Sequence, residues 1–205
     1  RGHSSQNFPK KSYGIETRDS EGENFNISLF GMPEENDWVL YAPYSDKSLM
    51  RNVLAYDIVR SLGSYAPRTQ FCEVILNNDY VGIYVFMEKI KKDGDRVDID
   101  DPEPENLSGG YLLELETYSK LDNTDNFFES ATIGRPYVIH FPKDDDITDD
   151  QNAWIENYIN EFESILYSDS FNDLDIGYDQ YIDSPSWVDY ILLNEALRNN
   201  DVFHS

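Results

Sequence analysis

The first half of the chain carries short apolar runs separated by turn-forming residues. β-Branched and aromatic side chains are concentrated in Ser12–Glu16, Asn26–Phe30 and Trp38–Tyr41. Runs of this length, bounded by Gly, Pro, Asn and Asp, are typical of β-strands. We therefore expect the first half to be built mainly from β-structure.

A hairpin is predicted near the middle of the chain. Two apolar runs, Gln70–Leu76 and Tyr80–Ile90, flank the turn-forming sequence Asn77-Asn78-Asp79. The first run contains Cys72, the only cysteine of the sequence. A single cysteine in an apolar strand is typically a small packed side chain, so we expect neither a nucleophile nor a metal ligand there.

One helix is expected between the early strands and the hairpin. Apolar residues recur every four positions from Met50 to Leu62, which places them on one face of a helix. Ser45 or Asp46 can cap its start, and Gly63 can end it.

A charged, proline-bearing stretch separates the two halves. Residues 92–108 include Asp101-Pro102-Glu103-Pro104-Glu105, and we expect the stretch to be exposed because it is too polar to be buried. We place a lobe boundary in it, with residues 1–96 as the first lobe and 97–205 as the second. Strands are predicted beyond it at Tyr111–Glu116 and Tyr137–Phe141.

Two helices are predicted to close the chain. The first covers residues 148–168, with Thr148 as its cap. Its apolar stripe comprises Ile155, Ile159, Phe162 and Leu166. The second begins with Ser184 as cap and Pro185 at the first helical position. Its inward side chains are expected to be Val188, Ile191 and Leu192.

Charge is distributed unevenly between the two halves. Residues 1–96 hold 12 Lys and Arg against 14 Asp and Glu, whereas residues 97–205 hold 4 against 26. Because the acidic half offers no clustered cations, we expect neither a nucleic-acid nor a membrane partner. An anionic small ligand fits the near-neutral half better. No run reaches the length of a membrane span or forms a signal-peptide core.

The predicted order of elements is that of a protein-kinase-like fold, with a β-rich lobe that contains one helix, a hairpin that leads into a linker, and a helical lobe. Several sequence blocks carry a closer resemblance. In chain order they are Arg1-Gly2-His3-Ser4-Ser5, Phe8-Pro9-Lys10-Lys11-Ser12-Tyr13, Tyr41–Asn52, Tyr65–Thr69, Gly82-Ile83-Tyr84 and Glu88-Lys89-Ile90. Together these blocks resemble the CotH family, the spore-coat protein H kinases.

The resemblance implies an α+β, two-lobe, protein-kinase-like fold and an atypical kinase activity. Such a protein would use ATP with Mg²⁺ or Mn²⁺ to phosphorylate the Ser or Thr hydroxyls of a coat or secreted protein, in the spore coat or outside the cell. The family's metal-binding aspartate lies downstream of the catalytic loop, beyond Ser205. We therefore expect the chain to be truncated at both ends and this fragment by itself to be inactive; the oligomeric state stays open.

Nucleotide-binding residues are expected mainly near the start of the chain. Gly2, Ser4 and Ser5 would bring backbone N–H groups and hydroxyls to the phosphate oxygens. Lys10 or Lys11, on the strand that follows, would supply positive charge. Taken without the resemblance, the same residues would form an ordinary solvated turn.

Two further groups complete the predicted nucleotide site. Glu88 belongs to a hinge at Met87-Glu88-Lys89, where backbone groups would meet adenine. Lys47 and Arg51, four residues apart on the predicted helix, would contact phosphates or pair with Glu88. They could equally be ordinary surface cations.

The catalytic aspartate implied by the resemblance is Asp201, which would orient the acceptor hydroxyl. Asn199 or Asn200 would hold its loop. The sequence Asn199-Asn200-Asp201-Val202-Phe203-His204 is also similar to the catalytic segment of HipA-type kinases, although their histidine usually lies one residue nearer the aspartate. No metal ligand is assigned within residues 1–205.

An alternative function is a catalytically dead kinase-like fold that acts as a surface adhesion or spore-coat structural module. Its acidic lobe would then be the contact surface. Nucleotide binding distinguishes the two functions, because the enzyme needs ATP with a divalent metal and the module needs neither. A carbohydrate-associated module, suggested by 15 Tyr and 3 Trp, is a weaker alternative because aromatic residues at strand and helix spacing usually pack in a core.

Overall fold

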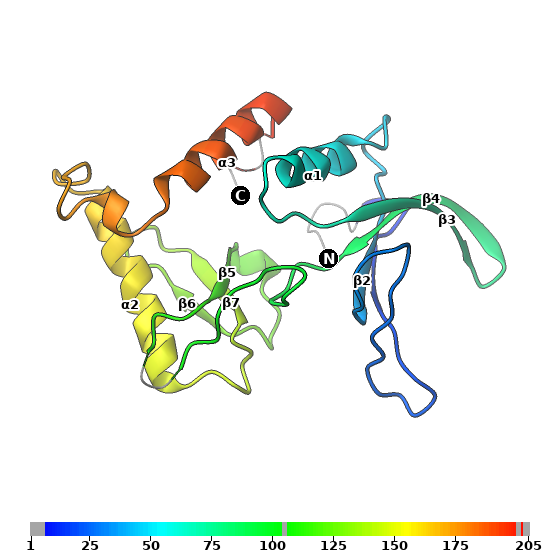
Figure 1. Cartoon of the computed structure of the whole chain (residues 1–205), viewed down its shortest axis with the longest axis horizontal. Coiled ribbons are helices and arrows are strands. Elements are labelled where there is room, and N and C mark those ends of the chain that lie inside the picture. Colours follow the sequence, from blue (N-terminus) through cyan, green and yellow to red (C-terminus); the bar gives the residue numbers. More distant parts are fainter. Residues whose placement is uncertain (1–6, 104–105, 200–201, 203–205) are drawn as a thin grey trace. The chain divides into compact units, whose positions relative to one another are not determined.

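The computed structural model describes residues 7–103, 106–199 and 202. The chain forms two compact units, Arg1–Asp98 and Ile99–Ser205. Over the described ranges the structure is mixed α/β, with two antiparallel sheets and three α-helices (Figure 1). None of these helices is both long and apolar enough to cross a membrane.

Unit 1 is built on a four-stranded antiparallel sheet. Its strands are β1 (Tyr13–Glu16), β2 (Asp37–Tyr41), β3 (Thr69–Leu76) and β4 (Asp79–Glu88), in the order β1-β2-β4-β3. The strand expected at 26–30 does not form. Ile27 makes only an isolated bridge to Glu35, and positive φ angles at Phe30 (54°) and Gly31 (76°) turn the backbone away from an extended path.

The predicted hairpin is confirmed as β3 and β4 (Figure 1). Leu76 pairs with Asp79, so Asn77 and Asn78 form a two-residue loop. Both have positive φ, 51° and 69°, as required by the mirror-image turn whose twist matches that of the strands. Asparagine tolerates this left-handed conformation better than most residues, which explains why this sequence turns here.

One buried cluster of unit 1 lies on a single face of this sheet. Met32, Trp38 and Phe86 are buried together, with the Trp38 and Phe86 ring centroids 5.0 Å apart. Cys72 packs against this cluster, and burial raises the pKa of its thiol. The expectation that Cys72 is a packed side chain is therefore confirmed.

The helix of unit 1, α1 (Arg51–Ser61), begins later than expected. The Asp46 carboxylate accepts hydrogen bonds from the Ser48 backbone N–H (2.9 Å) and the Arg51 backbone N–H (2.9 Å), and Leu49 has a φ of 62°. These contacts hold residues 46–49 in a turn. Lys47 consequently lies outside the helix, so the expectation that it shares a helical face with Arg51 is wrong.

Unit 2 combines a three-stranded sheet with two helices. The strands are β5 (Leu112–Leu115), β6 (Phe127–Glu129) and β7 (Pro136–Phe141), in the order β5-β7-β6. The helices are α2 (Asp149–Leu166) and α3 (Ser184–Leu197), and the short 3₁₀ turns are η2 (Tyr118–Lys120) and η3 (Tyr178–Gln180). Sequence patterns did not predict β6, because three residues are too few to establish a period.

Helix α2 confirms the prediction for its start. The Thr148 hydroxyl accepts the Gln151 backbone N–H, and the Gln151 side chain accepts the Thr148 backbone N–H in return. This reciprocal arrangement satisfies two donors at the end of the helix. Ile155 is buried with Phe128 and Ile139, so α2 closes one face of the small sheet.

Helix α3 differs from its predicted packing. It starts at Ser184 with Asp183 in the cap position, one residue earlier than expected. The side chains expected to point inward are exposed: Val188 by 53%, Ile191 by 45% and Leu192 by 62%. The buried residue on this helix is Asn194, whose amide donates to the Tyr190 carbonyl. Apolar side chains occur around the whole helix, so hydrophobicity does not identify its covered face.

Candidate nucleotide site in unit 1

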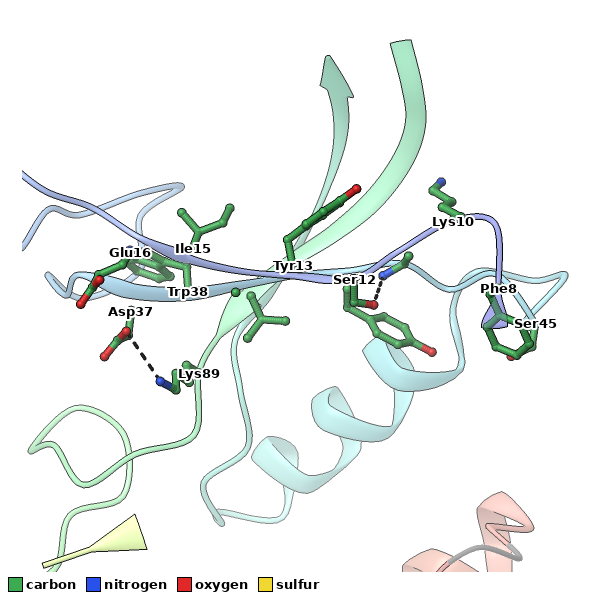
Figure 2. Close-up of a pocket in the computed structure, with 14 residues that line it drawn as sticks. Phe8, Lys10, Ser12, Tyr13, Ile15, Glu16, Asp37, Trp38, Ser45 and Lys89 are labelled. Carbon is green, nitrogen blue, oxygen red and sulfur yellow. Dashed lines mark hydrogen bonds and ion pairs between the residues drawn. The ribbon is translucent and has the colours of Figure 1, made fainter. Parts of the chain in front are cut away.

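A hollow of about 850 Å³ lies along β1 and β2, entirely within unit 1 (Figure 2). This volume is within the range of small-molecule sites. Aromatic and aliphatic side chains form much of its lining. The polar side chains that line it are Lys10, Ser12, Glu16, Asp37, Ser45 and Lys89. This lining offers apolar contact for a ring and both signs of charge.

Strand β1 divides the lining into two sides. Figure 2 shows Lys10, Tyr13 and Ile15 on one side of the strand, with Asp37 and Lys89 on the other. Tyr13 and Ile15 share one face of β1 because alternate side chains of a strand point the same way, whereas Asp37 belongs to β2 and Lys89 follows β4. The hollow therefore follows the strand, and its two cationic residues lie on different faces.

The Lys10 side chain contacts two residues of β4. Its Nζ donates to the Ile83 carbonyl at 2.5 Å and lies 4.4 Å from the centroid of the Tyr84 ring. Gly82 permits this approach, because its φ is 92° and a Cβ at that position would lie only 3.2 Å from Lys10 Nζ. Lys10 precedes β1 rather than lying on it, which corrects the expectation of a strand lysine. Lys11 is exposed and also precedes β1.

On the other side of β1, Asp37 is shared by two ammonium groups. Lys89 Nζ is 3.8 Å from Asp37 Oδ1, and Lys91 Nζ donates to Oδ2 at 3.0 Å. Burial acts to raise the pKa of Asp37, but the Lys91 hydrogen bond and the charges of Lys89, Lys91 and Arg96 outweigh it and lower that pKa. Asp37 is therefore ionised, and it holds the Lys89 ammonium at the edge of the hollow.

Arg96 contacts three residues that line this end of the hollow. Its Nη1 donates to the Asp37 carbonyl (2.9 Å) and to the Lys89 carbonyl (2.8 Å), and the guanidinium carbon is 5.1 Å from the Trp38 ring centroid. The Arg96 side chain is only 1% exposed, and its Nη1 lies 3.9 Å from Glu35 Oε2. The expectation that residues 92–108 are uniformly too polar to be buried is therefore wrong at Arg96.

Glu88 is part of the support of the site. Its fully buried carboxylate accepts the Arg68 backbone N–H at 2.8 Å and Arg68 Nη1 at 2.7 Å. The predicted alternative that Lys47 or Arg51 pairs with Glu88 is wrong. Arg51 Nε lies 3.6 Å from Asp46 Oδ1, and Lys47 is exposed.

A tyrosine next to this ion pair, Tyr65, is half-buried, and its hydroxyl oxygen is fully buried. Burial and the negative charge of Glu88 raise the pKa of Tyr65 to about 12. The Tyr65 hydroxyl has no hydrogen-bond partner among the described residues. Tyr65 therefore stays neutral at physiological pH.

Several of the predicted catalytic and phosphate-binding residues fall in parts of the chain that the structure does not describe. Gly2, Ser4, Ser5, Asn200 and Asp201 are outside the described residues. Asn199 follows α3 in unit 2, where its amide donates to Asn194 Oδ1 at 2.9 Å. Within the described ranges, no group of three or more His, Cys, Asp or Glu side chains is arranged to hold a metal ion.

Sequence comparison identifies the class of protein. The chain matches the model of the CotH kinase protein family over residues 1–205 and belongs to that family. A curated relative, the inner spore coat protein H of Bacillus subtilis (strain 168), is 33% identical over 81 residues. That alignment covers 38% of this chain and 22% of the relative. The chain thus aligns with well under two thirds of the relative's length.

Proposed function

We propose that the full-length protein is an atypical protein kinase that transfers the γ-phosphate of ATP to Ser or Thr hydroxyls of a protein. The hollow in unit 1 carries this proposal, because it combines an apolar lining with Lys10 and Lys89 in the near-neutral half of a CotH kinase family member. Triphosphate binding requires such cations, whereas the second half is dominated by carboxylates.

In this proposal the two compact units correspond to the two lobes of a kinase-like fold. Adenine would meet backbone groups near Met87–Lys89, at the end of β4. Gly2, Ser4 and Ser5 would contact phosphates, with Lys10 supplying positive charge. Glu88 would act through the structure, since its side chain is committed to Arg68.

Phosphoryl transfer would break the bond between the γ-phosphorus and the β,γ-bridging oxygen and form a bond to the acceptor oxygen. Asp201 would orient the acceptor hydroxyl and take its proton, with Asn199 and Asn200 holding the loop. Mg²⁺ or Mn²⁺ would neutralise charge on the phosphates. The described residues contain no candidate ligand group for it.

The substrate would be a protein of the spore coat or the cell exterior, by analogy with the relative that is a spore coat protein. A non-enzymatic coat module is the competing function. The strongly acidic second half, with 26 Asp and Glu against 4 Lys and Arg over residues 97–205, favours that alternative.

The test is transfer of labelled γ-phosphate by the full-length protein with Mn²⁺ or Mg²⁺, compared with its Asp201→Asn variant. The kinase predicts metal-dependent labelling of a protein substrate that is lost in the variant. Asp179→Asn is a matched control, because it removes a carboxylate of unit 2 whose hydrogen-bond partner among the described residues is the Ser184 hydroxyl. Absence of transfer and of ATP binding in the wild-type protein would instead support the coat module.

A further inference from the structure

Arg96 bridges two residues of the hollow without lining the hollow itself. The ladder between β2 and β4 has Trp38 opposite Glu88 as its last pair on this side. Asp37 and Lys89 are the residues just beyond that pair, and both line the hollow. Arg96 Nη1 donates to the carbonyls of both, at 2.9 and 2.8 Å. One nitrogen atom thus joins the two backbones where the ladder stops.

We infer that Arg96 is a positioning residue for the ligand site of unit 1. By fixing the Asp37 and Lys89 carbonyls, it sets the separation of two backbone segments whose side chains form the charged end of the hollow. The inference about the geometry of this end stands independently of the ligand. Its expected effect on ATP affinity rests on the proposed function.

The surroundings of Arg96 restrict its movement. Its guanidinium lies over Trp38, a fully buried residue that also borders the hollow. Glu35 lies 3.9 Å away and is itself paired with Lys91 at 2.8 Å. Arginine suits this position because its planar group can stack on an aromatic ring while donating within its plane. A lysine would retain the charge but lose the planar stacking.

Unit 1 also contains a matched control. Arg60 Nη1 donates to the Ala66 carbonyl at 3.3 Å and to the Pro67 carbonyl. Like Arg96, it joins two backbone carbonyls through one nitrogen atom. None of these three residues lines the hollow. If both arginines only stabilise the fold, substituting either one should affect the affinity for the ligand equally. If Arg96 positions the site, only its substitution should weaken ligand binding.

The experiment compares full-length wild-type, Arg96→Lys and Arg60→Lys proteins in three measurements. Calorimetry gives the ATP affinity in the presence of Mn²⁺, urea unfolding gives stability, and hydrogen exchange gives local protection of residues 37–39 and 88–91. Arg96→Met serves as a second variant that removes the donors altogether. If it does not fold, Arg96→Lys carries the comparison.

We expect both lysine variants to lose stability. Only Arg96→Lys should weaken ATP binding, by about tenfold, because a binding group of the site would be displaced. Faster exchange at residues 37–39 is also expected only in Arg96→Lys. Unchanged affinity and exchange in Arg96→Lys, or an equal loss of affinity in Arg60→Lys, would overturn the inference. If the wild-type protein binds no ATP, the proposed function fails, and the exchange comparison still decides the role of Arg96.

Discussion

The buried carboxylate of Glu88 allows a quantitative test of how unit 1 is held together. Its side chain is fully buried and accepts two hydrogen bonds from Arg68, one from the backbone and one from the guanidinium. Glu88→Gln keeps the size of the side chain but removes its charge. The backbone N–H of Arg68 can still bond to the amide oxygen, so the change acts mainly on the ionic contact.

The expected cost follows from these contacts. A hydrogen bond to a charged group contributes about 1.5–3 kcal/mol, and a buried donor without a partner adds a penalty. The Arg68 side chain is 40% exposed, so its guanidinium can turn toward water and recover part of that loss. We therefore expect Glu88→Gln to lower the free energy of unfolding of unit 1 by about 2 kcal/mol.

Trp38 provides the signal for this measurement because it lies opposite Glu88 in the β2 and β4 ladder. Residues 1–205 contain 3 Trp, so substituting Trp154 and Trp187 by Phe leaves Trp38 as the sole indole reporter of this range. With every Trp outside this range of the full-length protein substituted in the same way, urea unfolding would follow unit 1. Glu16→Gln is the control, since Glu16 pairs with Arg18 at the surface and should cost below about 1 kcal/mol. Equal costs for Glu88→Gln and Glu16→Gln would refute the reasoning.

Three further changes test other parts of the structure. Ile155→Ala should lower the free energy of unfolding of unit 2 by about 2–5 kcal/mol, measured by urea unfolding, because it leaves a cavity beneath α2; a cost below about 1 kcal/mol would contradict this packing. Asn78→Val should lower the stability of the hairpin by about 1–2 kcal/mol relative to Asn78→Gly, because φ is positive there; equal urea midpoints would contradict the turn assignment. Burial acts to raise the pKa values of Glu35 and Asp37, but Lys91 and neighbouring charges lower both. Their contribution to stability should be present above the unfolded values of about 4.5 and 3.8 and be lost as the pH falls through the lower folded values. Lys91→Met should flatten this part of an acid titration, and an unchanged profile would contradict the assigned contacts.

Local sequence signals predicted those elements whose structure depends on nearby residues. The hairpin follows from two asparagines that adopt positive φ, and the start of α2 follows from the Thr148 hydroxyl. The start of α1 was missed because Asp46 binds backbone groups in a turn before the helix. A capping residue and a turn residue of the same type cannot be distinguished from sequence alone.

Candidate site residues were harder to predict because their partners are distant in sequence. Arg96 lies in a stretch that reads as exposed, yet it is buried by contacts with Trp38 and with the carbonyl of Asp37, 59 residues earlier. The partner of Glu88 is Arg68, 20 residues away, rather than a residue of α1. Charge pattern indicates how polar a segment is, but burial depends on whether the fold supplies matching acceptors.

The central claim is that the hollow of unit 1 binds ATP. The most direct test is photolabelling of the full-length protein with 8-azido-ATP and Mn²⁺, followed by mass spectrometry of the labelled peptides. The account predicts labels within residues 8–16, 37–45 or 87–89 that are suppressed by excess ATP. Labelling that ATP does not suppress, or ATP-suppressed labels confined to peptides outside these ranges, would contradict it.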